Sequence, residues 1–157
     1  MLSDNLDKIL IIDEDGAFGD DLTALLVAMG METKIVCDAT EGISMLRDGL
    51  YDIVIVDPVE HISTLEEISE HIPDVVVIAT TRVDAIGSSA RALKAGAIDL
   101  LPASELEPGQ FETVIRRAVD RKNMLRETVR LKKRIVRLYV VAGLCFIGGF
   151  LIFFLRW

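Results

Sequence analysis

The stretch that decides the fold is KILIIDED, residues 8–15. Its first five residues, Lys8–Ile12, form a short and almost wholly apolar run, which predicts a β-strand buried on both faces. Three acidic residues follow without a break: Asp13, Glu14 and Asp15. A buried strand that ends in carboxylates predicts an α/β domain with a polar site at the carboxyl end of that strand.

Segments of two kinds alternate after this strand. Short apolar runs rich in β-branched residues predict more strands, and the segments between them have the spacing of amphipathic helices. The strands are expected at Glu32–Cys37, Tyr51–Val56, Asp74–Ala79 and Ala97–Leu101. The helices are expected at about residues 16–29, 39–47, 63–71 and 84–95, and from Pro108 onward. Strands this apolar need helices on both faces, so the prediction is a five-stranded, parallel, doubly wound sheet.

Charge divides the chain into two parts. Residues 1–112 carry 23 acidic and 6 basic side chains, whereas residues 113–157 carry 2 acidic and 11 basic ones. The acidic part would repel phosphates, which excludes nucleic-acid binding by its general surface. The basic part precedes a hydrophobic segment, where basic side chains contact anionic lipid and set membrane topology.

The hydrophobic segment, residues 138–155, has 18 residues and no charge. A helix of this length spans roughly 27 Å, about the thickness of a hydrocarbon core. We therefore expect a single transmembrane tail anchor at residues 138–157, with Tyr139 and Trp157 at its two interfaces. Residues 123–137 would form a basic juxtamembrane helix. Because the basic residues precede the span, the domain before it is expected in the cytoplasm, at a bacterial inner membrane.

Polar side chains follow three of the predicted strands. Asp13 and Glu14 follow the first strand, Asp57 the third, and Thr80 the fourth. The carboxyl ends of parallel strands meet at one edge of a sheet, so these side chains are expected close together. Carboxylates so placed repel one another, and Mg²⁺ relieves that repulsion. The plainer alternative is that the acids only end their strands and face water.

These residues, with the run ALKAGA at Ala92–Ala97, resemble the receiver domain of bacterial two-component response regulators. The resemblance covers about residues 7–122 and implies a flavodoxin-like domain at residues 1–122. It implies that Asp13, Glu14 and Asp57 hold Mg²⁺, that Asp57 accepts a phosphoryl group, and that Thr80 hydrogen-bonds it. It also implies a signalling protein rather than an enzyme, with a histidine kinase or phosphotransfer protein as partner.

Several positions depart from that family. Its lysine and proline after the fifth strand are Ala103 and Ser104 here, and its aromatic switch position is Leu100. A phosphate-independent pseudo-receiver that acts as a membrane scaffold is therefore a second interpretation. The segment between Asp57 and Thr80 is also shorter than in the family, which predicts a shortened third helix.

Two expectations concern that short segment. Ser63 and Glu66 have the spacing of a capping box, so the third helix is expected to begin at Ser63. His61 is close to Asp57 and would serve as a ligand or a base there. The expectation for His61 is instead a loop histidine exposed to water.

Two rival classes use the same first loop. DEDG resembles the first motif of haloacid-dehalogenase-type phosphatases, with Asp13 as nucleophile and Asp15 as acid/base. Ala17 replaces the hydroxyl residue of that motif, and no later GDxxxD motif is present. A flavin- or nucleotide-binding module is disfavoured because the loop DEDGAFGDD would repel phosphate.

Output is expected through protein–protein contacts at the membrane, because no DNA-binding module fits in residues 123–137, between the receiver-like domain and the expected span. A homodimer is a further expectation. The heptad seam considered for it contains Leu125, Thr128, Lys132 and Ile135, and it is a poor one.

Overall fold

The computed structural model describes residues 7–14, 16, 18–57, 61–81, 86–102 and 108–155. Within the helices it leaves out the side chains at 86, 108, 129–130, 133–134, 136, 141–142 and 144–155. The chain divides into two compact units, Met1–Lys122 and Asn123–Trp157.

The described part of the first unit contains five parallel strands in the order β2-β1-β3-β4-β5. The strands are β1 (Lys8–Ile12), β2 (Glu32–Val36), β3 (Ile53–Val56), β4 (Val76–Thr81) and β5 (Asp99–Pro102). The helices are α1 (Gly19–Ala28), α2 (Ala39–Arg47), α3 (Ile62–His71), α4 (Ile86–Lys94) and α5 (Pro108–Leu155). The predicted five-stranded, parallel, flavodoxin-like fold is thereby confirmed. The strand order reverses between β1 and β3, which is where such sheets form their sites.

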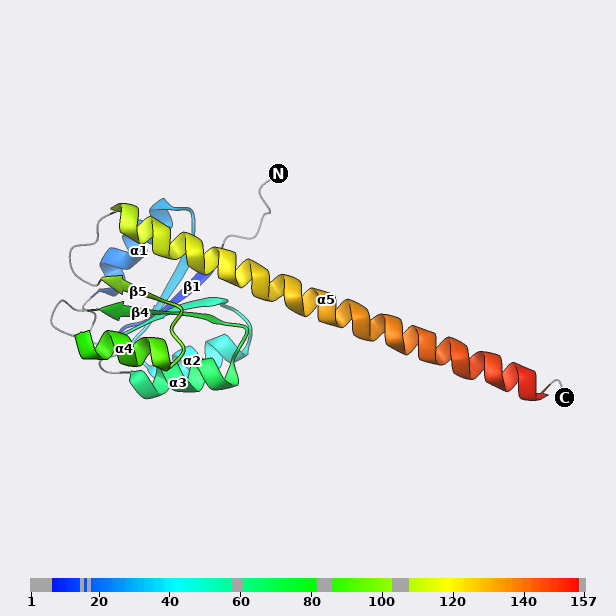
Figure 1. Cartoon of the computed structure of the whole chain (residues 1–157). Coiled ribbons are helices and arrows are strands. Elements are labelled where there is room, and N and C mark those ends of the chain that lie inside the picture. The colour runs from blue at the N-terminus through cyan, green and yellow to red at the C-terminus, as the bar shows by residue number, and fades with distance from the viewer. Residues whose placement is uncertain are drawn as a thin grey trace. The chain divides into compact units, whose positions relative to one another are not determined.

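Helices cover both faces of the sheet (Figure 1). The domain part of α5 lies with α1 on one face, and α2, α3 and α4 lie on the other. Strand residues are fully buried on both sides, for example Ile11 and Ile55 on one face and Ile12 and Val56 on the other. This explains why the strands are apolar throughout instead of alternating. Packing is tight, since a Cβ on Gly42 of α2 would lie 2.8 Å from Ile12 Cδ1.

The third helix differs from the prediction. It begins at Ile62 after the N-cap residue His61, which makes no side-chain capping bond, so the expected capping box at Ser63 is wrong. Its length is ten residues, equal to that of α1, so α3 is not short beside α1, and its expected shortening relative to the family stays a prediction. The connections on either side of α3 are short: α3 begins five positions after Asp57, and β4 begins five positions after α3 ends.

Two ion pairs attach the first part of α5 to the amino ends of strands. Lys122 is buried, and its ammonium group donates to the carboxylate of Asp7, just before β1. Arg117 donates to Asp99 of β5 over 3.1 Å. With the buried Phe111 and Ile115, these contacts hold this part of α5 against the sheet as an integral helix of the domain.

In the second unit the backbone is helical through Leu155. The expected transmembrane segment, residues 138–157, falls mostly on side chains outside the described ones. Among the residues that are described, no helix is both long and apolar enough to cross a membrane.

Candidate functional site

Asp13, Asp57 and Thr80 form one row across the carboxyl edge of the sheet. Ile12 pairs with Val56, and Val56 with Ala79, so the residues that follow them continue the same row. Thr80 was expected after the fourth strand, but it lies within β4, which ends at Thr81. β3 lies between β1 and β4, so Asp57 is the middle member of the row. Neighbouring strands lie about 4.8 Å apart. Side chains alternate between faces, so these three share the face of Ile11, Ile55 and Ile78. The sequence-based prediction that they gather at one edge agrees with this register.

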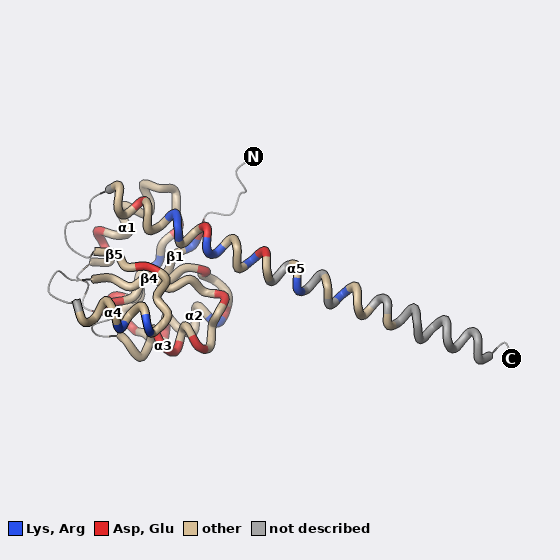
Figure 2. Tube along the Cα trace, viewed as in Figure 1, with Lys and Arg blue, Asp and Glu red and all other residues tan. Residues whose placement is uncertain are grey.

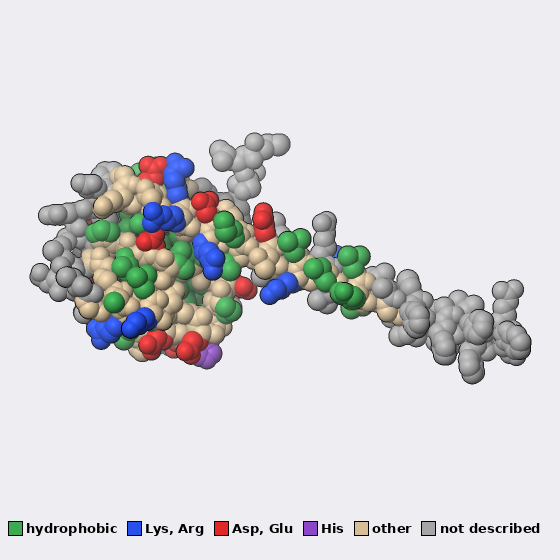
Figure 3. Space-filling view, in the orientation of Figure 1, with side chains coloured by type: hydrophobic (Ala, Val, Ile, Leu, Met, Phe, Trp, Pro, Cys, Tyr) green, Lys and Arg blue, Asp and Glu red, His purple; other side chains and the backbone are tan. Residues whose placement is uncertain are grey.

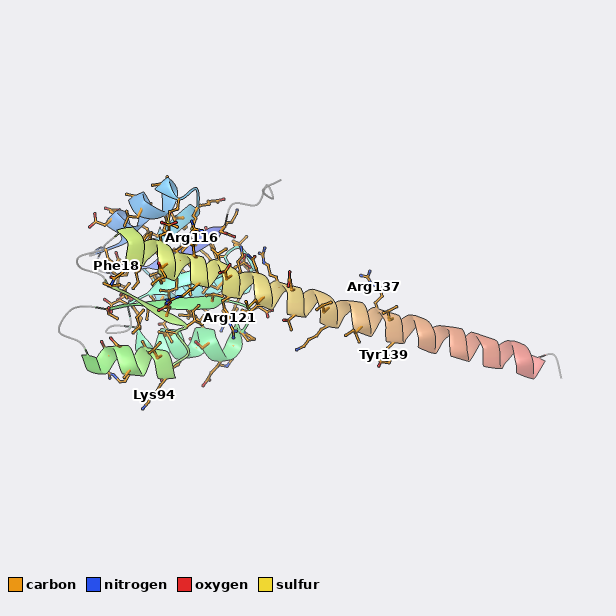
Figure 4. The ribbon with its side chains drawn as sticks, turned by 45° about the horizontal axis from the view of Figure 1, so that its top comes forward. Phe18, Lys94, Arg116, Arg121, Arg137 and Tyr139 are labelled. Carbon is orange, nitrogen blue, oxygen red and sulfur yellow. The ribbon has the colours of Figure 1, made fainter. Side chains whose placement is uncertain are left out.

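Asp13 is buried and also serves the start of α1. Its Oδ2 accepts hydrogen bonds from the backbone N–H groups of Gly19, at 2.7 Å, and Phe18, at 3.2 Å. The N-cap residue of α1 is Phe18 (labelled in Figure 4), which makes no side-chain capping bond. Asp13 therefore satisfies N–H groups that the end of a helix leaves without partners. A Cβ on Gly19 would lie 2.9 Å from Asp13 Oδ2, so glycine at this position permits the contact.

Asp57 and Thr80 are buried side by side, with 4% and 1% of their surfaces exposed. The Thr80 hydroxyl forms no hydrogen bond within the described part of the chain. A buried polar group without a partner costs about 1–3 kcal/mol. Such a group in a native fold calls for an explanation, and a ligand that binds next to Asp57 would supply the missing partner.

His61 was expected in water, and that expectation is wrong: 6% of the residue is exposed. His61 is the N-cap residue of α3, and its backbone forms hydrogen bonds on both sides. The backbone N–H of His61 donates to the Asp57 carbonyl at 3.1 Å, and its own carbonyl accepts from Leu65 at 3.0 Å. His61 Nε2 lies 3.7 Å from Glu14 Oε2, whose side chain is half exposed. In the sequence, the one signal that places His61 beside this site is that it follows Asp57 by four residues.

The three predicted metal ligands do not form one cluster. No group of three or more His, Cys, Asp or Glu side chains is close enough to share a metal ion within the described ranges. Asp13 is directed to the start of α1 and Glu14 toward His61. Asp13 and Asp57 are the predicted ligands that share a buried row.

Several positions that matter to the interpretation lie outside the described residues, namely Asp15, Ala17, Ala103 and Ser104. The phosphatase interpretation of DEDG, and the effect of alanine at the family's lysine position, therefore stay predictions. Leu100 is described, and it lies half-buried in β5 against the apolar core, next to Ala79 of β4.

A 2-1-3-4-5 parallel sheet with a buried carboxylate and hydroxyl row at its carboxyl edge defines a flavodoxin-like domain of the receiver type. No family model matches the sequence. The transcriptional regulatory protein ZraR of Escherichia coli is 30% identical over 118 residues, which is 73% of this chain and 26% of ZraR. The chain thus spans about a quarter of the length of the curated relatives it matches.

Solved structures agree with this comparison. NtrX from Brucella abortus superposes with a TM-score of 0.73 at 24% identity, over 83% of this chain and 30% of NtrX. A response regulator receiver domain from Clostridium thermocellum superposes with a TM-score of 0.66 at 26% identity, over 76% of this chain and 99% of that domain. Together these relatives support a receiver (CheY-like) domain of the response-regulator class in this chain.

Proposed function

We propose that this protein is a membrane-tethered, response-regulator-like protein in a phosphorelay, with Asp57 as its phosphoacceptor. The observation that carries the proposal is the buried Asp13–Asp57–Thr80 row, with a Thr80 hydroxyl that has no hydrogen-bond partner in the described part of the chain. The donor would be a histidine kinase or a phosphotransfer protein. Output would run through protein–protein contacts.

The chemistry follows from the row. A carboxylate oxygen of Asp57 attacks phosphorus and forms a P–O bond, while the P–N bond of a phosphohistidine breaks and the freed imidazole takes up a proton. The Thr80 hydroxyl then donates to a phosphoryl oxygen. The buried hydroxyl gains in this way the partner that it lacks in the described structure.

Mg²⁺ fits the donor chemistry of this edge, because it prefers carboxylate oxygens and keeps several waters. Asp13 and Asp57 would hold it from the buried row, and Glu14 would join them by leaving His61. When bound, the ion would offset the negative charge of the carboxylates and of the incoming phosphoryl group.

The test uses the full chain in detergent micelles with acetyl phosphate and Mg²⁺, followed by intact-mass measurement. We expect a gain of one phosphoryl group, which is lost in Asp57→Asn and when EDTA is added. The matched control is Asp52→Asn, just before the other end of β3, which should be phosphorylated like the unaltered chain. A folded chain that gains no phosphoryl group from acetyl phosphate or from a purified histidine kinase would refute the phosphoacceptor role.

Membrane tethering is the second part of the proposal. Support comes from the 18 uncharged residues at 138–155 and the basic residues before them. The domain would lie in the cytoplasm of a bacterium, with residues 138–157 crossing the inner membrane once. The full chain should stay with membranes in alkaline carbonate, and a chain cut after residue 137 should be released. Release of the full chain would contradict the anchor.

A specific observation favours one other function. With Ala103 at the family's lysine position and Leu100 at its aromatic position, two parts of the usual switch are absent from the sequence. A pseudo-receiver scaffold would keep the fold and its partner contacts without phosphate. The phosphorylation experiment separates the two proposals, because only the first requires a modified Asp57.

A further inference from the structure

We propose that a second copy of this chain binds along residues 124–138 as a parallel, two-stranded coiled coil. The contact surface, here called the 124–138 seam, contains Met124, Thr128, Leu131, Ile135 and Leu138. This inference lies within the second unit and does not depend on phosphorylation at Asp57.

The first observation is a row of exposed apolar side chains. Met124, Leu131, Ile135 and Leu138 are 61%, 58%, 51% and 67% exposed. The seam positions follow one another by four, three, four and three residues, which keeps them on one face of a helix. Figure 3 shows hydrophobic side chains along this stretch of α5. Large apolar side chains repeated at this spacing indicate a surface that is covered by another helix.

The residue types at the seam select the kind of partner. Ile135 at position a, with Leu131 and Leu138 at position d, follows the choice that favours two parallel strands. Thr128, at the other a position, is also β-branched. The Thr128 hydroxyl donates to the Met124 carbonyl of its own helix at 2.9 Å. Its burial in an interface would therefore leave no donor without an acceptor.

Charge at the sides of the seam supports the same pairing. Glu127 occupies position g and Lys132 the following position e, and both side chains are exposed. In a parallel pair, Glu127 of one copy meets Lys132 of the other on each side of the interface. Figure 2 shows the charged residues along this helix, and Figure 4 shows Arg137 and Tyr139 leaving it on opposite sides. The outward position c of Arg137 keeps its charge away from the seam.

The sequence continues the pattern beyond the described side chains. Ala142, Cys145, Gly149 and Ile152 hold the next seam positions, which extends the repeat to roughly four heptads. Small residues at such positions let helices approach closely inside a membrane. The heptad seam considered from sequence alone included Lys132. In the 124–138 seam, which is defined by the exposed apolar side chains, Lys132 lies at position e, beside the interface.

The first test is cysteine cross-linking in the full chain in detergent, with Cys37→Ser and Cys145→Ala as background. Leu138→Cys and Leu131→Cys should form disulfide-linked dimers under mild oxidation. Val140→Cys is the matched control, because it is also apolar and 55% exposed but lies at the outer position f. We expect at least about fivefold more dimer from Leu138→Cys, because only seam cysteines come within disulfide reach. Equal cross-linking at positions 138 and 140, or none at either, would overturn the proposal.

The second test concerns orientation. Glu127→Lys should weaken the dimer, measured by sedimentation in matched-density detergent, because two lysines would then face each other. Adding Lys132→Glu should restore it. A single exchange without effect, or a double exchange without recovery, would rule out the parallel pairing. Cross-linking of position 138 to a different protein only, in membranes from the expressing cell, would show that the occupant is not a second copy.

Discussion

Polar groups are buried at both ends of the sheet, but the two ends differ in the partners that these groups have. At the amino end, the Lys122 ammonium group meets the Asp7 carboxylate, and the pair joins α5 to the start of β1. At the carboxyl end, Thr80 is buried without a hydrogen-bond partner in the described structure, and His61 Nε2 has only the 3.7 Å contact with Glu14. Asp13, also at the carboxyl end, has protein partners at the start of α1, so the difference between the ends lies in Thr80 and His61. A buried group with a protein partner is satisfied within the fold, whereas the Thr80 hydroxyl is available to a ligand.

The largest effect on stability is expected at the amino end. Asp7→Ala would leave Lys122 buried without its carboxylate, and should lower the free energy of unfolding by about 3–5 kcal/mol. The measurement is urea unfolding of a fragment of residues 1–137 that circular dichroism shows to be folded.

The control for this change is Glu32→Ala, which breaks the exposed Lys8–Glu32 pair at the same end of the sheet. It should cost less than about 1 kcal/mol, because exposed ion pairs contribute little. Equal losses from the two variants would contradict the structural role assigned to the partly buried Asp7–Lys122 pair.

A smaller effect is expected where the carboxyl edge joins α1. Gly19→Ala would bring a Cβ to 2.9 Å from Asp13 Oδ2 and 3.0 Å from Ile35 Cδ1. It should cost about 1–3 kcal/mol in the same unfolding measurement, and it should slow phosphorylation by displacing Asp13. Gly87→Ala in α4 is the control, since its Cβ would meet nothing within 4 Å. If both variants unfold alike, the close approach at Gly19 is not needed.

The smallest effect on stability is expected inside the row. Thr80→Val removes a hydroxyl that has no described partner, so the free energy of unfolding should change by less than about 1 kcal/mol. Phosphorylation of Asp57 by acetyl phosphate should nevertheless slow by at least about tenfold, because a donor to the phosphoryl group is lost. Thr80→Ser should keep most of the rate. If Thr80→Val lowers the free energy of unfolding by more than Asp7→Ala does, the comparison of the two ends is wrong.

Much of the fold follows from local pattern. β1 and α2 have the predicted bounds, and the other strands agree to within two residues at each end. This works because a strand covered on both faces is apolar throughout, and because parallel strands bring their carboxyl ends to one edge. The row of Asp13, Asp57 and Thr80 could therefore be predicted before any coordinates.

Two of the misses concern the residues around the start of α3. The capping box at Ser63 failed because α3 starts at Ile62. The expected exposure of His61 failed because that residue is the N-cap of α3, bonded through its backbone to Asp57 and Leu65. No periodic pattern reports the path that a chain takes between elements.

By itself, the sequence determined the alternation of elements, the parallel sheet and the polar residues at its carboxyl edge, because burial on two faces leaves a pattern along the chain. Only the tertiary structure decided that Asp13 caps α1, that His61 meets Glu14, and that Lys122 meets Asp7 across 115 positions. Those contacts depend on how the helices pack against the sheet. The periodic patterns in the sequence relate near neighbours in the chain, so they do not predict which distant side chains meet.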